Sequence, residues 1–257
     1  MLKGKTALIT GASKGIGQAI AVAYAQKGCD LILVSRDERK LAANANQLTK
    51  SYGVKVQWHA CDLTNHQKVV EMVNMAEDFK AIDILVNNAG ILKGNSFLEY
   101  SMSDFKDVFD TNVFGVVGLS QAVLKKMISR RSGRVINIAS TAGKWGSKNQ
   151  SAYNMSKHAI VGLTRCLALE MAGNSITVNA ICPWVVETDM AGNYLKNQAK
   201  NSGRSYDEVM SLLQSSAPIG RLVKPEEVAS LAVYIASEES GSITGQSWTV
   251  DGGYTMI

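Results

Sequence analysis

Short apolar runs alternate with amphipathic stretches along the chain. The runs are rich in Val, Ile and Leu, and they predict strands at 6–10, 30–35, 55–60, 83–87, 134–140, 176–181 and 247–250. The stretches between them have helical spacing at about 15–27, 38–51, 65–79, 103–130, 151–172 and from Pro225 onward. We expect loop and short helix over 183–216. Strands that are apolar on both faces and separated by helices are typical of a parallel sheet covered on both sides.

This order of elements predicts an α/β, doubly wound Rossmann fold. The sheet should have seven parallel strands in the order 3-2-1-4-5-6-7, with helices on both faces. The chain has 257 residues and no repeat or linker, so we expect one domain over residues 1–257. Because 46% of the residues are hydrophobic, the chain can bury a sizeable core.

Composition and charge exclude several classes of function. The net charge of +5 is modest and the basic residues are scattered, apart from a group at 125–134, so we expect no nucleic-acid partner. No run approaches the ~18 apolar residues of a membrane span, and the N-terminus has no signal-peptide pattern. We therefore expect a soluble, cytoplasmic protein without a membrane partner. The histidines lack ligand spacing and the cysteines form no C-x-x-C pair, which predicts no metal and reduced, buried cysteines.

A glycine-rich loop, TGASKGIG, joins the first strand to the first helix. Gly11, Gly15 and Gly17 lack a Cβ, which permits a tight turn and lets a pyrophosphate approach the helix N-terminus. The spacing is G-x-x-x-G-x-G instead of the commoner G-x-G-x-x-G. Because the loop follows the first strand of a predicted parallel sheet, we expect a dinucleotide site here and not merely a turn.

The end of the second strand, LVSRDE, indicates which dinucleotide binds. An acidic residue there would bind the ribose hydroxyls and repel a 2′-phosphate, but Ser35 occupies the position and Arg36 follows it. Arg36 can pair with a phosphate through two hydrogen bonds, and Lys14 in the glycine loop adds a second positive charge. Asp37 comes one residue late and is typical of a helix cap. We therefore expect NADP(H), with NAD(H) as the alternative.

Two further motifs extend the predicted cofactor site. CDLT places Asp62 after the third strand, where its carboxylate can meet the adenine amino group. NNAG, at 87–90, follows the fourth strand, and its small residues allow close approach of the backbone to a cofactor. Both motifs fall at the carboxyl ends of strands, where ligands bind in open α/β sheets.

Ser140, Tyr153 and Lys157 form the candidate catalytic group. Ser140 ends the fifth strand, and Tyr153 and Lys157 lie four residues apart on the next helix, so the two share one face. Tyrosine has a pKa near 10, but an ammonium about 5 Å away would favour the phenolate by roughly 3 kcal/mol, or about two pKa units. We expect Tyr153 to exchange a proton with a carbonyl as hydride moves, with Ser140 orienting the carbonyl oxygen. Lys157 can hold the nicotinamide ribose, and Asn112, in FDTNVFG, can hold a water that links Lys157 to solvent.

Together these motifs resemble the short-chain dehydrogenase/reductase family over essentially the whole chain, with GRLVKPEEVA and TGQSWTVDGG as further matches. The resemblance implies a hydride-transferring oxidoreductase with a catalytic tetrad at Asn112, Ser140, Tyr153 and Lys157. It implies cofactor contacts from Gly11, Ser13, Lys14, Gly15, Ile16, Gly17, Ser35, Arg36, Asp62, Leu63, Asn88, Ala89, Gly90, Tyr153, Lys157, Pro183, Val186 and Thr188. It also implies a homotetramer, in which the helices at 103–130 and 151–172 pack across a two-fold axis and the C-terminal strand region forms a second interface.

Within the family the chain is most similar to 3-oxoacyl-[acyl-carrier-protein] reductases and polyketide ketoreductases. VNAICPWVVETDMA and SKHAIVGLTRCLALEMA are the segments that indicate this. The family usually has Pro-Gly after the sixth strand, but this chain has Trp184 after Pro183, which should narrow or reshape the substrate entrance. Members that use a carrier protein bind it through two arginines near the mouth of the site. Arg131 matches the first and Asn174 occupies the second, so an acyl carrier protein stays an open alternative as partner.

We expect residues 184–216 to form a lid over the substrate, with the 144–150 loop as another wall. The predicted substrate residues are Ser140, Trp145, Tyr153, Trp184, Met190 and Tyr194. Their apolar character favours a neutral ketone or an acyl thioester over a small keto acid, unless these aromatics only pack the lid. The prediction is an NADPH-dependent carbonyl reductase acting on a 3-oxoacyl thioester. The alternatives are a dehydrogenase of another secondary alcohol (hydroxysteroid, sugar alcohol or 3-hydroxy acid) and a non-enzymatic NADP(H)-binding sensor or scaffold.

Overall fold

The computed structural model describes residues 1–256 and contains a sheet of seven parallel strands, as the apolar runs predict. The strand order is β3-β2-β1-β4-β5-β6-β7, which confirms the doubly wound Rossmann topology. The strands are β1 (Thr6–Thr10), β2 (Asp30–Ser35), β3 (Val56–Ala60), β4 (Ile84–Asn87), β5 (Gly133–Ile138), β6 (Ile176–Pro183) and β7 (Ser247–Val250).

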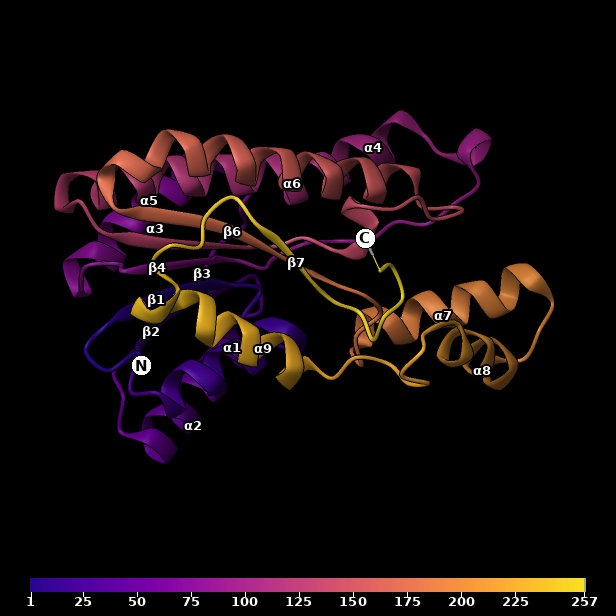
Figure 1. Cartoon of the computed structure of the whole chain (residues 1–257), viewed down its shortest axis with the longest axis horizontal. Helices are drawn as coiled ribbons and strands as arrows, with labels where there is room; N and C mark the ends of the chain where they lie inside the picture. The colour runs from indigo at the N-terminus through magenta and orange to yellow at the C-terminus, as the bar shows by residue number, and fades with distance from the viewer. Residues whose placement is uncertain (257) are drawn as a thin grey trace.

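Helices cover both faces of the sheet (Figure 1). One face is covered by α1 (Gly15–Gln26), α2 (Glu38–Tyr52) and α9 (Pro225–Ala236). The other is covered by α3 (His66–Phe79), α5 (Gly115–Arg130) and α6 (Ser151–Met171). Every residue of β1 and β6 is buried, because side chains on both faces of these strands pack against helices.

Local sequence signals set the ends of several helices. Asp37 caps α2 by accepting a hydrogen bond from the Lys40 amide at 3.1 Å, as its place after β2 predicts. α9 begins at Pro225, whose missing N–H costs nothing in the first turn. The carboxylate of Glu227 reaches back and accepts a hydrogen bond from the Lys224 amide at 2.8 Å. These caps satisfy backbone groups that would otherwise be unpaired at the helix starts.

A chain of buried polar side chains crosses the centre of the sheet. The register of β4 and β5 places Asn87 beside Asn137, and the Asn87 side chain donates to Asn137 at 2.8 Å. Asn87 also donates to Ser120 on α5 at 3.1 Å, and Asn137 donates to Thr164 on α6 at 2.9 Å. Losing one partner would leave a buried polar group unpaired, so this row of hydrogen-bonded side chains holds β5 against α6. The candidate catalytic residues come from these two elements.

The region expected as one helix over 103–130 is interrupted. α4 (Met102–Phe109) is followed by a π-helical turn, Asp110–Phe114, before α5 begins. A Cβ at Gly115 would lie 2.9 Å from the Cβ of Leu63, so α5 passes very close to the segment after β3. This contact is distant in sequence, and therefore the spacing within the helix did not indicate the interruption.

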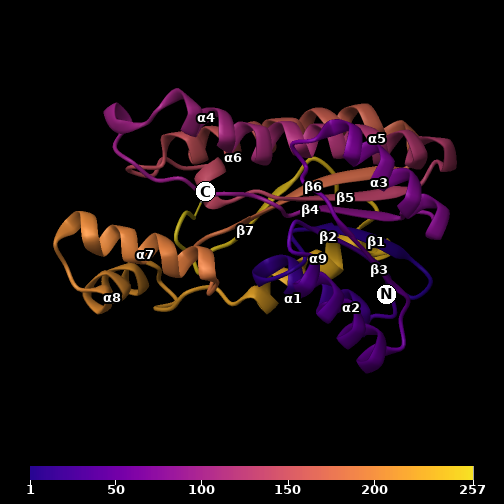
Figure 2. The ribbon, with the colours of Figure 1, turned by 180° about the vertical axis from the view of Figure 1, so that it is seen from behind.

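Residues 183–216 contain more helix than expected. They form α7 (Asp189–Ser202) and α8 (Tyr206–Ser216), which begin at capping residues Thr188 and Ser205. Both helices are largely polar, which weakens their periodicity: α7 buries three residues and α8 buries none. Figures 1 and 2 show the pair extending beyond the sheet, away from the helices that cover its faces.

Three cysteines are buried as expected, but the expectation is wrong for Cys166, which is exposed. It lies on the side of α6 opposite to Thr164 and Ala168, whose side chains face the sheet. Within residues 1–256, no helix has the length and apolar character to cross a membrane. The same part of the chain holds no group of three or more side chains that could ligate a metal.

Candidate active site

A cavity of about 1180 Å³ follows the carboxyl ends of the strands. The predicted cofactor residues that line it are Gly11, Ser13, Lys14, Gly15, Ile16, Ser35, Arg36, Asp62, Leu63, Asn88, Ala89, Gly90, Tyr153, Lys157, Pro183, Val186 and Thr188. It is also lined by the predicted substrate residues Ser140, Trp145, Trp184, Met190 and Tyr194. Two predicted residues, Gly17 and Asn112, are instead buried behind its wall. Residues far apart in the sequence therefore meet in one space.

The glycine loop forms a cradle without room for side chains. Gly11 and Gly15 have φ angles of 65° and 58°, which favour glycine. A Cβ at Gly17 would lie 2.4 Å from the Gly11 carbonyl oxygen and 2.5 Å from the amide nitrogen of the Asn88 side chain. α1 begins behind the loop with no side-chain cap and no acidic residue in its first turn. Its free N–H groups are therefore available to an anion such as a pyrophosphate.

Thr10, Asn88 and Asn44 hold this cradle in place. The Thr10 hydroxyl accepts hydrogen bonds from the amides of Asn88 and Ala89 at 2.9 and 3.0 Å. The Asn88 side chain returns a hydrogen bond to the Thr10 carbonyl at 2.9 Å. On the other side, Asn44 of α2 donates to the Ala12 carbonyl at 3.1 Å. The loop is thus fixed from two directions, and no motif in the sequence indicated Asn44.

The end of β2 presents two cations to the cavity. Arg36 lines it, as predicted, and so does Lys40 one turn into α2. The Ser35 hydroxyl accepts a hydrogen bond from the Asp37 amide at 3.1 Å. The Asp37 carboxylate is engaged in capping α2, as its place in the sequence indicates. No motif in the sequence indicated Lys40.

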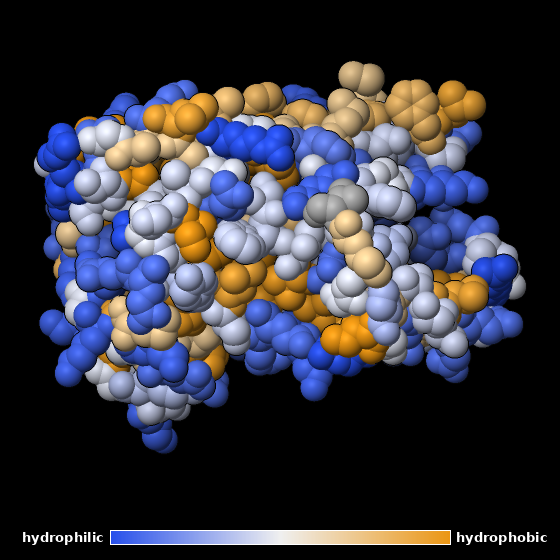
Figure 3. All heavy atoms as spheres, in the orientation of Figure 1, coloured by the Kyte–Doolittle hydropathy of each residue, from blue (hydrophilic) through white to orange (hydrophobic). Residues whose placement is uncertain are grey.

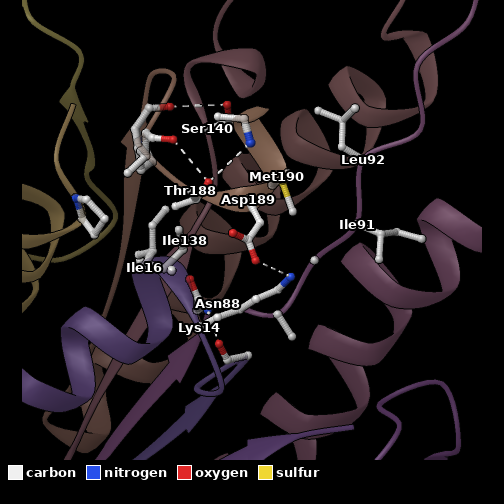
Figure 4. A pocket seen from close by; sticks show the side chains of 18 of the residues that line it. Lys14, Ile16, Asn88, Ile91, Leu92, Ile138, Ser140, Thr188, Asp189 and Met190 are labelled. Atoms are coloured by element: carbon white, nitrogen blue, oxygen red, sulfur yellow. Dashed lines mark hydrogen bonds and ion pairs between the residues drawn. The ribbon is translucent and has the colours of Figure 1, made fainter. Parts of the chain in front are cut away.

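Two other predicted cofactor residues are paired within the chain. Asp62 accepts hydrogen bonds from the amide and hydroxyl of Thr64 at 3.0 and 2.9 Å, which hold the pKa of its carboxyl below the usual range. Lys14 forms an ion pair with Asp189 of α7 at 3.0 Å (Figure 4). The side chains of Lys14 and Asp189 are 58% and 68% exposed, so this pair is weak. It joins the glycine loop to the predicted lid.

Ser140, Tyr153 and Lys157 meet as predicted. Ser140 follows β5, whereas Tyr153 and Lys157 come from the first turns of α6. The Lys157 ammonium lies 5.6 Å from the centroid of the Tyr153 ring. Lys157 is buried and donates a hydrogen bond to the Ile138 carbonyl at 2.8 Å. The Ser140 hydroxyl accepts from the Ala142 amide at 3.1 Å, which orients it at the end of the strand.

The predicted direction of the Tyr153 pKa shift is wrong for this structure. Burial raises the pKa of Tyr153 to about 12, and a hydrogen bond with Ser140 offsets this only in part. Burial also lowers the pKa of Lys157 to about 8. The prediction counted the attraction between ammonium and phenolate and omitted the cost of burying both charges. Tyr153 is therefore a protonated phenol near neutral pH. Of the two residues, Lys157 has the pKa that lies closer to neutral pH.

Asn112 is held by the backbone of Ile91. Its side-chain oxygen accepts from the Ile91 amide at 2.8 Å, and its nitrogen donates to the Ile91 carbonyl at 2.9 Å. The same nitrogen donates to Ser156 at 3.1 Å, and Ser156 donates to the Tyr153 carbonyl at 2.7 Å. The π-helical turn that contains Asn112 thus ties α6 to the segment after β4. The role of Asn112 in holding a water stays a prediction.

Three aromatic rings form one wall of the cavity. Trp184 stacks on Tyr254 with 5.0 Å between ring centroids and 25° between planes. Trp145 meets the same Tyr254 edge-on at 6.0 Å. Tyr254 follows β7 and also lines the cavity. No signal in the sequence indicated Tyr254, because DGGYTM contains no periodicity that points to a pocket.

α7 forms the facing side of this part of the cavity. Met190 points into the space near Ser140 and Thr188 (Figure 4). Tyr194 follows one turn later, and burial raises the pKa of its hydroxyl, which hydrogen-bonds to Gln150. The predicted substrate residues on α7 thus approach the loop before α6. Gln150 lines the cavity as well and belongs to the 144–150 loop that was predicted as a wall.

Within one chain, Arg131 and Asn174 lie far from the first turn of α6, and their part in binding an acyl carrier protein stays a prediction. Arg131 follows α5 and donates to the Gly173 carbonyl at 2.9 Å, next to Asn174. These residues lie beyond the C-terminal end of α6, whereas Tyr153 is in its first turn. The helix from Tyr153 to Met171 spans about 27 Å.

The sheet order, the glycine cradle and the Ser-Tyr-Lys group define a class of protein: the chain belongs to the short-chain dehydrogenase/reductase family. The family model described as enoyl-(acyl carrier protein) reductase matches residues 11–255. The resemblance noted in the sequence is thereby confirmed, and the protein is an oxidoreductase of this family.

Particular relatives narrow the comparison. The chain is 35% identical to the 3-oxoacyl-[acyl-carrier-protein] reductase FabG of Vibrio cholerae, over 100% of this chain and 99% of that one. A variant of actinorhodin polyketide ketoreductase, solved with NADPH, is 35% identical with a TM-score of 0.95, over 100% of both chains. NAD⁺-bound xylitol dehydrogenase is 31% identical with a TM-score of 0.95, over 98% of this chain and 99% of that one. Together these findings support an NAD(P)-dependent ketoreductase.

Proposed function

We propose that this protein is an NADPH-dependent carbonyl reductase that reduces the ketone of a 3-oxoacyl thioester. The observation that supports this best is that Ser140, Tyr153 and Lys157 line the same cavity as the glycine cradle. A dinucleotide held by the cradle and a protonated phenol would meet at one carbonyl group. Holding the two reactants in this way accounts for a large part of the rate acceleration that an enzyme can provide.

The cavity fits the phosphates of NADPH. The free N–H groups of α1 and the Cβ-free loop around Gly11 and Gly17 suit a pyrophosphate. Arg36 and Lys40 suit a 2′-phosphate, whereas Asp37 is engaged in its cap. Among the similar structures, the actinorhodin ketoreductase contains NADPH and the xylitol dehydrogenase contains NAD⁺. The two cations at the end of β2 favour NADPH for this chain.

The side chains of the site would assist reduction in three ways. Ser140 and Tyr153 would donate hydrogen bonds to the ketone oxygen and orient it. Bound NADPH would supply a hydride to the carbonyl carbon. Tyr153, whose pKa of about 12 keeps it protonated beforehand, would then give its proton to the oxygen as negative charge develops there. The Lys157 ammonium, 5.6 Å from the ring centroid, would stabilise the phenolate that remains.

The substrate proposal depends on the relatives and on the apolar wall. The Vibrio cholerae relative is a 3-oxoacyl-[acyl-carrier-protein] reductase and the actinorhodin enzyme is a polyketide ketoreductase. Trp145, Trp184, Met190 and Tyr254 suit an acyl chain better than a polyol, because polyol hydroxyls need hydrogen-bonding partners. Oxidation of a sugar alcohol is the second candidate, and the similarity to xylitol dehydrogenase favours it. Coenzyme A or an acyl carrier protein would present the thioester.

We further propose that the protein assembles as a homotetramer, with one domain per chain and residues 184–216 as its lid. Phe114, Ile128, Met155 and Leu169 are exposed on or beside α5 and α6, and Leu169 is 84% exposed. Figure 3 shows apolar side chains along the edge of the molecule where these helices lie. Contiguous exposed apolar surface is typical of protein interfaces. Sedimentation velocity would test this assembly.

The direct test of the function is the initial rate of NADPH and NADH oxidation with acetoacetyl-CoA and with a panel of cyclic and aryl ketones. We expect turnover of the thioester with NADPH at least tenfold faster than with NADH. Faster turnover with NADH would contradict the role of Arg36. Oxidation of xylitol without reduction of any 3-oxo compound would favour the second candidate. Tight NADPH binding without turnover of any carbonyl would favour a non-enzymatic sensor.

A further inference from the structure

The ring wall, defined as Trp145, Trp184 and Tyr254, contains one buried ring and one ring with free surface. Trp184 is 8% exposed and packs into the core below the sheet edge. Trp145 is 46% exposed, although it lines the cavity and touches Tyr254. A single exposed aromatic ring is common on protein surfaces, but this one borders the cavity. The free surface of Trp145 therefore lies where a ligand can cover it.

Hydrogen bonds fix the backbone of the ring wall at its two tryptophans. The Trp145 carbonyl accepts a hydrogen bond from the Asn154 side chain at 2.7 Å, directly beside Tyr153 in α6. The Trp184 amide donates to the Val250 carbonyl at 3.1 Å, which continues the pairing of β6 with β7. The distance between the ring wall and the catalytic tyrosine is thereby set by two regular elements.

A turn built on Asp251 holds Tyr254 between the two tryptophans. Its carboxylate accepts hydrogen bonds from the Gly253 amide at 3.1 Å and from the Thr255 amide and hydroxyl at 3.0 and 2.6 Å. Both neighbours of Tyr254 are thus tied to one side chain. The tyrosine ring is presented in a fixed position and does not need a ligand to order it.

We propose that the ring wall selects 3-oxo substrates that carry an aromatic ring on the ketone carbon, with Trp145 as the residue that contacts this ring and Tyr254 as the residue that positions Trp145. This rests on the proposed function, because it concerns the group attached to the carbonyl that Tyr153 protonates. A phenyl ring next to the carbonyl would lie against Trp145 and bury its free surface. Aromatic pairs gain affinity from edge and face contacts beyond the area that they bury. A methyl group in the same place would leave the surface of the tryptophan exposed to water.

Two esters that differ only in this group provide the test. Ethyl benzoylacetate has a phenyl group on the ketone carbon, and ethyl acetoacetate has a methyl group. We expect kcat/KM of the wild-type enzyme to be about tenfold or more higher for the phenyl ester, mainly through KM. Tyr254→Ala should reduce this ratio to about threefold or less, and Trp145→Ala should reduce it as well. Tyr254→Phe, which keeps the ring, should preserve the ratio.

Tyr234→Ala is the matched control, because Tyr234 is a half-exposed tyrosine on α9 that does not line the cavity. It should leave the ratio unchanged. Thermal melting and the Kd for NADPH of each variant separate lost selectivity from lost folding, and the exposed Trp145 can be truncated without opening the core. A wild-type ratio near one, or a ratio that Tyr254→Ala and Trp145→Ala leave intact, would overturn this proposal alone. Failure to reduce either ester or acetoacetyl-CoA would instead overturn the proposed function.

Discussion

The cofactor side and the substrate side of the cavity are built from different parts of the chain. On the cofactor side, α1 buries five residues, and the loop before it presents backbone atoms around Gly11 and Gly17. On the substrate side, α7 buries only Ala191, Leu195 and Ala199, and α8 buries none. The surface presented there consists of large side chains, chiefly aromatic rings and Met190.

This difference shows how proteins of one fold can bind the same cofactor and yet differ in the substrate that they bind. A cradle made of backbone atoms has no side chain that a substitution could exchange. Its atoms are held in place by the sheet, because the loop directly follows a strand. Met190 and Tyr194 lie on α7 and can be altered without disturbing the sheet, because few buried contacts hold this helix. Four substitutions or conditions would break or sharpen this contrast.

The largest effect is expected from Tyr153→Phe, at the point where the two sides meet. The change removes the hydroxyl that donates the proton and keeps the ring, so kcat should fall by about 10²- to 10⁴-fold. The Kd for NADPH, measured by fluorescence titration, should change little, since the cradle is untouched. Turnover within threefold of the wild-type rate would rule out Tyr153 as the proton donor.

Gly17→Ala tests the rigidity of the cofactor side. The new Cβ would lie 2.4 Å from a backbone oxygen, so the loop must shift, at a cost of about 1–3 kcal/mol. We expect the Kd for NADPH to rise by up to about 100-fold and the melting temperature to fall. Gly192→Ala on α7 is the matched control, because nothing lies within 4 Å of its Cβ. If both alanines behaved alike, the contrast between the two sides would be lost.

Arg36→Ala tests which cation distinguishes the cofactors. A charge-assisted hydrogen bond contributes about 1.5–3 kcal/mol, so the Kd for NADPH should rise about 10- to 100-fold while that for NADH stays the same. Arg39→Ala, on an exposed residue of α2 that does not line the cavity, should change neither. Equal losses for both cofactors would mean that Arg36 supports the site generally and reads no 2′-phosphate.

The smallest effect is expected from pH between 7 and 8. Burial lowers the pKa of Lys157 to about 8 and raises the pKa of Tyr153 to about 12. Lys157 is therefore charged below pH 8 and loses its charge as the pH rises through 8, whereas Tyr153 keeps its proton throughout. For reduction, kcat/KM should fall about twofold from pH 7 to 8, about fivefold from pH 8 to 9 and about tenfold per unit beyond, following the charged fraction. A profile that rises between pH 7 and 9 would contradict this assignment.

Much of the fold could be predicted from the sequence because its strands are short, continuous apolar runs. The runs at 6–10 and 30–35 coincide with β1 and β2, and the parallel order follows from general rules of handedness. The π-helical turn at Asp110–Phe114 and the helices α7 and α8 could not be predicted in this way. The first depends on contacts with distant segments, and the others have too few buried residues to produce a clear period.

Part of the candidate site was equally visible in the sequence. The glycine loop and the Ser140, Tyr153 and Lys157 group follow fixed spacings, and the structure brings them together. Tyr254 could not be found, because it reaches the cavity only through the pairing of β6 with β7 and the turn on Asp251. The Tyr153 pKa was also out of reach, since the degree of burial that controls it is a property of the folded chain.

The ion pair between Lys14 and Asp189 links the cofactor side of the cavity to its substrate side. It connects the glycine loop to α7, and both residues line the cavity, so α7 is held beside the loop while the pair is formed. Both partners are more than half exposed, so added salt weakens their attraction. The ionic strength of the surroundings would therefore influence how firmly the two sides of the cavity are joined, while leaving the chemical step itself unchanged.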